Sequence, residues 1–297
     1  MKQAQSIAVG SIVLGLIVLA LKFAAWAVTG SAALFSDAAE SVVNVAASVV
    51  AWLALRLAAK PADANHPYGH DKAEFFAAVI EGVLIVVAAL VILQHAWHSY
   101  WAPAPIEAAS MGKGMALNAA STVLNLLWAM LLFRKGKIHR SAALTADAHH
   151  LATDVVTSIG VLCGVGLVVL TGLPWLDPVI AAATAVYILV AGFFLIRDSV
   201  GGLMDAAPAE VIVERIRTIV GEHADGAIEA HDLRTRHAGR LTFLEFHLVV
   251  PGAMTVSSAH AICDRIEAAL KAEMEGLMIT IHVEPEGKAK HRGILVL

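Results

Sequence analysis

The chain has 297 residues, of which 58% are hydrophobic and 15% are charged, and its mean hydropathy is +0.72. Soluble domains are roughly half apolar and a quarter charged, so this composition excludes an ordinary soluble protein and indicates a membrane protein. The formal net charge of −4 gives no electrostatic reason to expect a nucleic-acid partner.

Apolar stretches long enough to span a bilayer, which takes ~20 residues as a helix, recur along the first two thirds of the chain. We expect six transmembrane helices, at residues 7–29, 33–57, 74–99, 112–133, 142–171 and 177–203. Lys and Arg gather at the N-terminus and in the connections at 56–72 and 134–140. The positive-inside rule therefore predicts that both chain termini are cytoplasmic.

The remaining segment is more polar and alternates between helical and strand periodicity. Helices are predicted at 208–222 and 255–271, and strands at 228–237, 241–250 and 278–284. The order αββαβ predicts a small α+β domain. We therefore expect a six-helix transmembrane bundle over residues 1–206 and a cytoplasmic α+β domain over residues 207–297.

One pattern of polar residues is written twice inside the apolar stretches. The first copy is Asp37, Glu40 and Asn44, and the second is Asp147, His150 and Asp154. In a helix these spacings place each set within roughly 60° of one face. Because ionisable side chains in a bilayer are costly, they line an interior pathway or pair with one another. Carboxylate, amide and imidazole groups from two facing helices predict a divalent-metal site, and the alternative is hydrogen bonding between helices.

A metal site that contains histidine is sensitive to protons. His150 must be neutral to bind a metal ion, so metal and proton compete for it. This competition provides a basis for exchanging a metal ion for protons. Two further ionisable residues in apolar stretches, Glu81 and Lys22, remain without an assigned role.

Two more clusters contain metal-ligand residue types outside the apolar stretches. Asp63, His66 and His70 have the spacing D-x-x-H-x-x-x-H, which fits either a metal-binding turn or a solvated polar loop. The polar segment contains His231, His247, His260, His282 and Glu284. These five side chains lie on several predicted elements, and the residues alone leave open whether they converge.

Taken together, these motifs resemble those of the cation diffusion facilitators. The similarity includes D-A-x-E-x-x-x-N, D-A-x-H-x-x-x-D, the D-x-x-H-x-x-x-H loop followed by G-H-D-K-A-E, and the segments H-D-L-R-T-R, E-F-H-L, A-H-A-I-C-D and I-H-V-E-P. It covers nearly the whole chain. The resemblance implies a homodimer in the bacterial inner membrane that exports divalent metal ions from the cytoplasm in exchange for protons. It implies no catalytic cofactor and no enzymatic activity.

The resemblance also implies a role for each candidate residue. Glu40, Asn44, His150 and Asp154 become the transport site, with Asp37 and Asp147 beside it. Asp63, His66 and His70 become a loop site, and His231, His247, His260, His282 and Glu284 become a binuclear site that binds metal as a structural or regulatory ligand. The cytoplasmic domain is implied to be ferredoxin-like, similar to metallochaperones, and dimerising. Lys72 and Asp205 match a salt bridge that joins the protomers.

The chain departs from the zinc-transporting bacterial branch of that family, which usually has Asp at the positions of Glu40, Asn44 and Glu284. The site in the bundle therefore has one carboxylate fewer, and the identity of the transported ion stays open. Zn²⁺ and Fe²⁺ are the most expected ions, and Co²⁺, Ni²⁺, Mn²⁺ and Cd²⁺ are the alternatives. The alternative function is a membrane metal sensor or partner-binding protein that has lost transport. A sensor needs no costly charges inside the bilayer, which favours the transporter.

Overall fold

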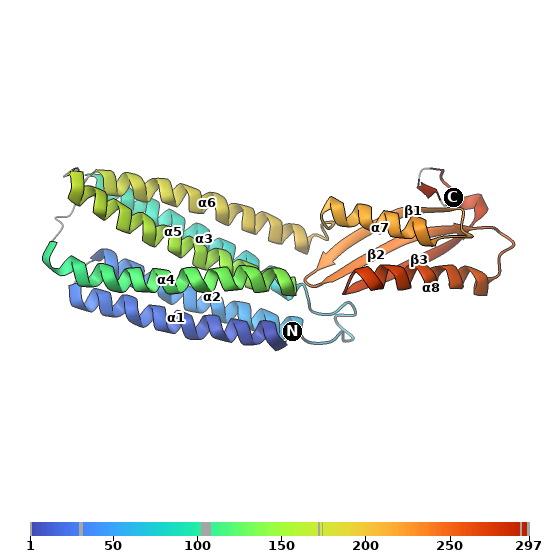
Figure 1. The fold of residues 1–297 in the computed structure, drawn as a ribbon, viewed down its shortest axis with the longest axis horizontal. Helices are drawn as coiled ribbons and strands as arrows, with labels where there is room; N and C mark the ends of the chain where they lie inside the picture. Colours follow the sequence, from blue (N-terminus) through green and yellow to red (C-terminus); the bar gives the residue numbers. More distant parts are fainter. Residues whose placement is uncertain are drawn as a thin grey trace. The chain divides into compact units, whose positions relative to one another are not determined.

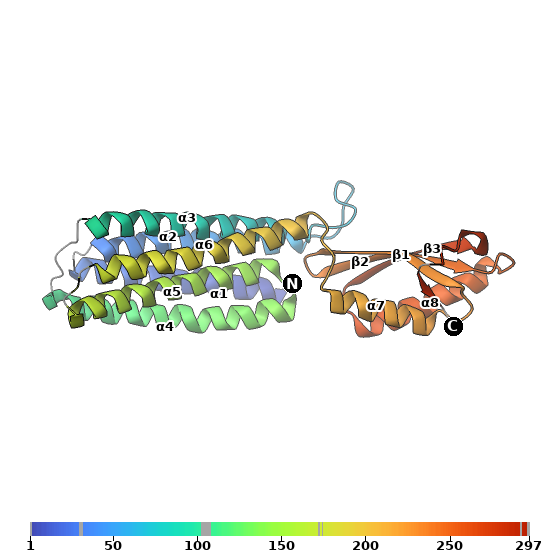
Figure 2. The same ribbon diagram turned by 90° about the horizontal axis from the view of Figure 1, so that it is seen from above.

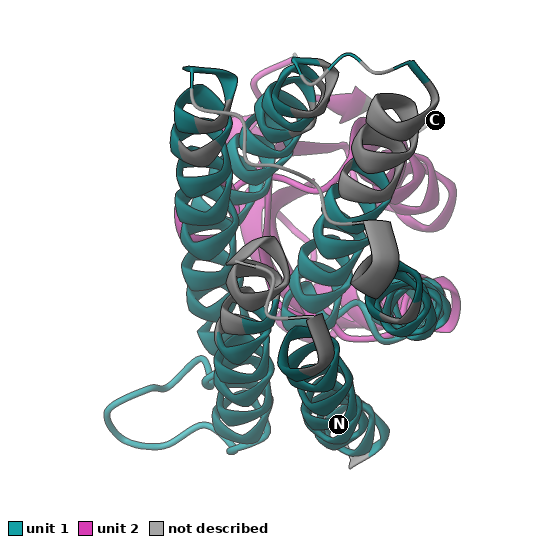
Figure 3. Ribbon diagram, turned by 90° about the vertical axis from the view of Figure 1, so that its left-hand side faces the viewer, with its two compact units in different colours: residues 1–200 teal, residues 201–297 magenta. Residues whose placement is uncertain are grey.

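The computed structural model describes residues 2–29, 32–101, 108–171, 173, 175–291 and 293–295. The chain forms two compact units, Met1–Val200 and Gly201–Leu297, which Figure 3 colours separately. The expected fold class, a helical transmembrane bundle followed by an α+β domain, is confirmed.

The first unit is a bundle of six long helices that lie side by side (Figures 1 and 2). They are α1 (Lys2–Thr29), α2 (Ala32–Ala58), α3 (Ala73–Trp101), α4 (Ala108–His139), α5 (Ala142–Thr171) and α6 (Leu176–Leu203). Four of them are apolar enough within the described residues to cross a membrane, over Gln3–Ala27, Ala73–His98, Gly114–His139 and Ala181–Leu203. The described part of α2 contributes only the shorter apolar stretch Asn44–Ala58. The repeated polar pattern lies on α2 and α5.

Helix packing brings α2 and α5 together. α5 contacts α2, α3 and α4, while α1 contacts α2 and α4. Much of the buried core between them is alanine, including Ala51, Ala54, Ala129 and Ala148. Small side chains let helix backbones approach closely, which is the usual basis of association between transmembrane helices. The two copies of the polar pattern therefore lie on neighbouring helices.

Glycines bring α3 close to α6. A Cβ atom added to Gly82 of α3 would lie 2.6 Å from Ile196 Cγ1, and one added to Gly192 of α6 would lie 2.9 Å from Ile85 Cγ2. Both distances are too short for carbon atoms, so neither position has space for a side chain. This contact holds α6 against the bundle through Ile85, Ala89 and Ile188.

We expect Gly82→Ala to destabilise the bundle although alanine favours helices. The added methyl group forces α3 and α6 apart, an overpacking effect of about 1–3 kcal/mol. The matched control is Gly112→Ala in α4, where an added Cβ meets no atom within 4 Å. Thermal unfolding of the detergent-solubilised protein measures both. Equal melting temperatures for the two variants would contradict the close contact.

The second unit is a four-stranded sheet with two helices. Its elements are α7 (Glu210–His223), β1 (Glu229–Ala238), β2 (Leu241–Val250), α8 (Val256–Glu273), β3 (Leu277–Pro285), a 3-10 turn (Glu286–Lys288) and β4 (Ile294–Leu295). The strand order is β3-β2-β1-β4, with β1 antiparallel to β2 and β4, and β2 parallel to β3. The predicted order αββαβ is confirmed, and β4 is an addition that is too short to produce a periodic sequence signal.

Both helices cover the same face of this sheet. The core contains Ile216, Ile219 and Val220 of α7, Ile262, Ile266 and Leu270 of α8, and Leu244, Phe246 and Leu248 of β2. Alternate residues of a strand point to opposite faces. Because Phe246 and Leu248 face the helices, Glu245 and His247 lie on the opposite face, which neither helix covers.

Candidate metal sites

A buried cluster joins α2 to α5. Asn44, His150 and Asp154 are all buried, with 5%, 4% and 3% exposure. The Asn44 amide donates a short hydrogen bond to Asp154 Oδ2, and Asn44 Oδ1 lies 2.5 Å from His150 Nε2. The first copy of the pattern thus meets the second at Asn44. The backbones of Glu40 and Asp37 lie in α2, but their side chains lie outside the described residues.

Several polar atoms at this cluster have no hydrogen-bond partner within the described residues. They include His150 Nδ1 and Asp147 Oδ2, whereas Asp147 Oδ1 accepts a hydrogen bond from Ser48 Oγ at 3.2 Å. Buried polar groups are nearly always hydrogen-bonded, so unpartnered atoms at one place indicate a missing ligand. A nitrogen and carboxylate oxygens are suitable donors for a first-row divalent cation.

Glu74 of α3 positions the helix that carries half of this cluster. Its carboxylate accepts hydrogen bonds from Ser141 Oγ and from the Ala143 N–H, at the first turn of α5. Ser141 Oγ in turn accepts from the Leu144 N–H at 3.3 Å, as an N-cap does. A carboxylate at a helix N-terminus also has a favourable interaction with the helix dipole. No local pattern in the sequence predicts this role, because Glu74 lies 69 positions from its Ala143 partner.

Glu81 and Lys22 are both inside the bundle and close to this cluster. Glu81 is fully buried at 0% exposure, and neither of its carboxylate oxygens has a hydrogen-bond partner within the described residues. Its carboxyl group lies near that of Asp147, and the amine of Lys22, which is 2% exposed, lies near His150. Both residues therefore act on the electrostatics of the cluster, which the sequence left open. His149 is exposed and packs edge-on against Phe133, away from the cluster.

The loop between α2 and α3 brings Asp63, His66 and His70 together. Asp63 Oδ1 accepts hydrogen bonds from the backbone N–H groups of Asn65 and His66, at 2.9 and 2.8 Å, and lies 3.3 Å from His66 Nδ1. Asp63 Oδ2 lies 3.5 Å from His70 Nε2. One potential ligand atom from each residue falls within a mutual distance of 4.8 Å. The side chains thus converge in a compact turn that can hold a cation, with His66 and Asp63 exposed.

We expect Asp63 to titrate below its ordinary pKa of 3.8, chiefly because the backbone N–H of His66 donates to its carboxylate. A depressed pKa in the folded state means that this turn is stabilised fully above pH 3.8 and loses the stabilisation as the pH falls through the lower, folded value. The ¹³C chemical shift of the Asp63 carboxyl group, followed from pH 6 downward, measures the midpoint. A midpoint equal to that of the denatured chain would contradict the hydrogen-bonded turn.

Three histidines form a row across the uncovered face of the sheet in the second unit. His231 of β1 pairs with His247 of β2, which pairs with His282 of β3. Neighbouring ring centroids lie 5.3 and 4.9 Å apart. Strand pairing places directly opposed residues on the same face, so the register alone brings these rings together.

Glu284 lies at the centre of this row. Its carboxylate oxygens are 3.3 Å from His231 Nε2, 3.4 Å from His247 Nδ1 and 3.8 Å from His282 Nε2. The ring nitrogens of His231 and Nδ1 of His247 form no hydrogen bond within the described residues. A carboxylate among three imidazoles with unused nitrogens is a ligand set suited to Zn²⁺ or a similar ion.

The structure adds one residue to this row and separates another from it. The added residue is Asp232, which no sequence motif predicts as a ligand. One potential ligand atom from each of His231, Asp232 and His247 lies within 4.8 Å of the other two. A hydrogen bond from Lys290 holds the pKa of Asp232 below its ordinary value. His260 lies on α8, is 74% exposed, and has Asp264 at 3.6 Å. Because α8 covers the other face of the sheet, His260 does not join the row within this chain.

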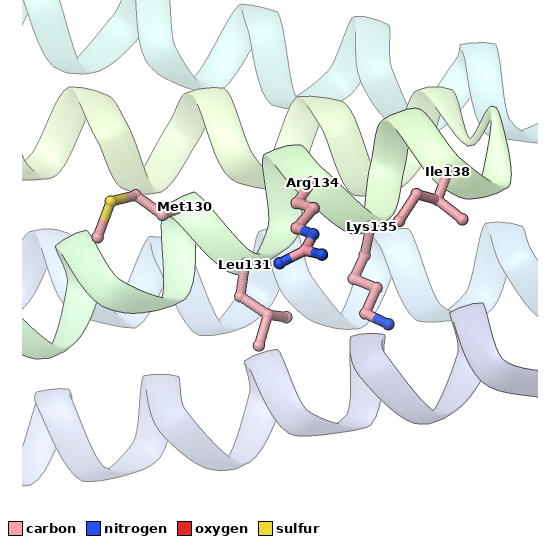
Figure 4. A pocket seen from close by; sticks show the side chains of 5 residues that line it. All are labelled: Met130, Leu131, Arg134, Lys135 and Ile138. Carbon is pink, nitrogen blue, oxygen red and sulfur yellow. The ribbon is translucent and has the colours of Figure 1, made fainter.

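The Lys72–Asp205 salt bridge between protomers stays a prediction. Within its own unit, Asp205 accepts a hydrogen bond from Arg236 Nη1 at 3.2 Å. A pocket of about 440 Å³ on α4, lined by Met130, Leu131, Arg134, Lys135 and Ile138, lies on the exposed side of that helix (Figure 4). It contains none of the candidate ligands.

Two family models together match almost the whole chain. The cation efflux transmembrane domain matches residues 8–204, and the cation efflux protein cytoplasmic domain matches residues 208–286. The chain belongs to the cation efflux family. The resemblance to cation diffusion facilitators is therefore confirmed, and the protein is a multi-pass cation transporter with a cytoplasmic C-terminal domain and not an enzyme.

Similar proteins in this family match along most of their length. The chain is 43% identical over 282 residues to an uncharacterized transporter of Synechocystis sp., sll1263, covering 95% of this chain and 90% of that protein. It is 32% identical over 275 residues to the cation-efflux pump FieF of Shewanella oneidensis, covering 93% and 92%. The solved structure of the Zn form of CzrB is 52% identical, covers 28% of this chain and 96% of that chain, and has a TM-score of 0.27.

Proposed function

We propose that this cation efflux protein exports a divalent transition-metal ion from the cytoplasm in exchange for protons. The observation that carries the proposal is the buried cluster of Asn44, His150 and Asp154 between α2 and α5, in which Nδ1 of His150 has no hydrogen-bond partner among the described residues. Glu40, which lies one turn before Asn44 in α2, completes the proposed ligand set, with Asp37 and Asp147 beside it. The relatedness to a cation-efflux pump supports the direction of transport.

Proton exchange follows from the ligand chemistry. An imidazole binds metal only when its ligand nitrogen is unprotonated, and a carboxylate only when it is ionised. Protons that arrive from one side of the membrane thus compete with the ion for His150 and Asp154. Their departure on the other side restores the binding form, so metal and protons occupy the cluster alternately.

The cytoplasmic row of His231, His247, His282 and Glu284 is proposed to bind the same ion in a structural or regulatory role. His260, which lies on the other side of the sheet in one chain, is proposed to join such a site only from a second copy of the chain. Asp63, His66 and His70 form the proposed loop site. The functional unit is proposed to be a homodimer in the bacterial inner membrane, assembled through the cytoplasmic domain and through a Lys72–Asp205 salt bridge. Both chain termini then lie in the cytoplasm, consistent with the Lys and Arg distribution.

We expect Asp154→Asn to abolish metal flux in proteoliposomes under an imposed proton gradient. The substitution keeps the size of the side chain but removes an ionised ligand, so flux should fall by about 100-fold or more. The matched control is Asp198→Asn on α6, where the carboxylate is exposed and pairs with its neighbour Arg197 at 2.8 Å. Undiminished flux in a folded Asp154→Asn protein would contradict the proposed site.

Asn44 is expected to govern which ion is carried. Asn44→Asp adds a carboxylate beside Asp154, raising the negative charge of the cluster and favouring Zn²⁺ over ions that accept neutral oxygen ligands equally well. A competitive flux assay with Zn²⁺, Fe²⁺, Mn²⁺, Co²⁺ and Ni²⁺ compares the variant with the unmodified protein. An unchanged order of preference would show that Asn44 does not contact the ion.

A further inference from the structure

The strand β1 has a bulge at the row of histidines. His231 pairs with His247 and Arg234 with Glu245, so two residues of β1, Asp232 and Leu233, oppose the single residue Phe246. Asp232 has a φ of 52°, in the left-handed region that Asp tolerates better than most residues. In a regular strand His231 and Asp232 would point to opposite faces. The bulge instead brings ligand atoms of both to within 4.8 Å of one another and of His247.

The carboxylate that the bulge presents is already held by a cation from the end of the chain. Lys290 Nζ lies 2.5 Å from Asp232 Oδ2, and the two side chains are 51% and 36% exposed. Lys290 belongs to the segment after the 3-10 turn, whose described residues are 289–291 and 293–295 and which we name the tail. A divalent ion bound to Asp232 and the two imidazoles would lie about 2.0–2.2 Å from the carboxylate oxygen. Ion and ammonium would then compete for the same carboxylate.

The tail is fixed to the sheet beside the same histidine. Glu229, 1% exposed, accepts hydrogen bonds from the backbone N–H groups of Lys290, His291 and Gly293 at 3.0, 3.0 and 2.9 Å. Glu229 Oε1 also lies 3.7 Å from His231 Nδ1. β4 then pairs with β1 at Glu229 and Ala230. The tail therefore contacts two carboxylates that lie beside His231 in the row of histidines, those of Asp232 and Glu229.

Docking of the tail requires a glycine. A Cβ atom added to Gly293 would lie 2.2 Å from the Ala230 carbonyl oxygen and 2.8 Å from Glu229 Oε1. No side chain fits there without detaching the segment. Gly293 thus offers a way to release the tail while leaving Lys290 and Asp232 unchanged.

We propose that Asp232 is a ligand of the cytoplasmic metal site and that Lys290 occupies it until a divalent ion arrives, so that metal binding frees Lys290 and loosens the tail, which Glu229 and β4 still hold. This proposal rests on the proposed metal role of the His231–His247–His282 row. The single charge of the ammonium is replaced by the double charge of the ion. The freed lysine moves into solvent, to which half of its side chain is already open. The tail is therefore expected to be more mobile when a metal ion occupies the site than when the site is empty.

Hydrogen–deuterium exchange of the full-length protein in detergent, with and without Zn²⁺, tests this loosening directly. We expect exchange of residues 289–295 to rise when Zn²⁺ binds. Lys290→Gln should raise exchange of the tail in the absence of metal and bind Zn²⁺ at the cytoplasmic site about two- to fivefold more tightly, the range set by the strength of an exposed ion pair. The matched control is Lys288→Gln in the adjacent 3-10 turn, which should resemble the unmodified protein.

Two further variants separate the role of Asp232 as a metal ligand from its ion pair with Lys290, which we name the latch. Gly293→Ala should release the tail without weakening Zn²⁺ binding, because all ligands remain. Asp232→Asn, which keeps the left-handed backbone accessible, should loosen the tail and also weaken Zn²⁺ binding. Unchanged exchange of the tail on adding Zn²⁺, equal behaviour of Lys290→Gln and Lys288→Gln, or undiminished Zn²⁺ affinity in Asp232→Asn would each overturn the proposal.

Transport is scored separately in proteoliposomes. If metal flux is absent while Zn²⁺ still loosens the tail, the proposed efflux function fails and the latch stands. If flux is present while the tail does not respond, the latch alone is wrong.

Discussion

The arrangement of the bundle depends on hydrogen bonds between buried polar side chains of α2 and α5. Each charged side chain at the centre of a membrane helix costs about 2.5–3.5 kcal/mol on insertion scales, so the cluster of Asn44, His150 and Asp154 is retained at a stability penalty. Hydrogen bonds through Asn44 offset part of that cost, and they require the two helices to stay in register. Alanine packing between α2 and α5, and the Glu74 carboxylate at the start of α5, keep that register. Within the described residues Nδ1 of His150 has no hydrogen-bond partner, and a bound ligand would offset that part of the cost.

The two histidine-containing sites use the same donor types in opposite surroundings. In the bundle, the imidazole of His150 and the carboxylate of Asp154 are buried, so leaving either without a partner costs free energy and occupancy by metal or protons is tied to stability. On the sheet, Glu284 is surrounded by three imidazoles on a face that the helices leave open. His247 and Glu284 are 35% and 16% exposed there, so solvent reaches them without entering the core beneath. The first setting suits transport and the second suits sensing.

The sequence predicted those features that depend on periodicity. Long apolar stretches gave the six helices, alternation gave the αββαβ order, and the repeated spacing brought attention to Asn44, His150 and Asp154. Long-range contacts were beyond that reasoning: Glu74 and Glu229 carry no motif, and each acts on a segment more than 60 positions away. Asp232 was not predicted as a ligand, because strict alternation along β1 places it on the face opposite to His231. The bulge in β1 brings it to the same side as His231. The convergence of His231, His247 and His282 likewise depends on strand register, which no single strand reveals.

The most direct measurement is anomalous X-ray diffraction, or element-specific density in an electron-microscopy map, for the protein loaded with its transported ion. We expect a metal peak inside the bundle, about 2.0–2.2 Å from a ring nitrogen of His150 and from a carboxylate oxygen of Asp154, with Glu40 close enough to bind. The Asn44–Asp154 hydrogen bond should be broken in that state. Metal density confined to the cytoplasmic domain and the loop, with the bundle cluster unchanged at saturating ion, would contradict a transport site between α2 and α5.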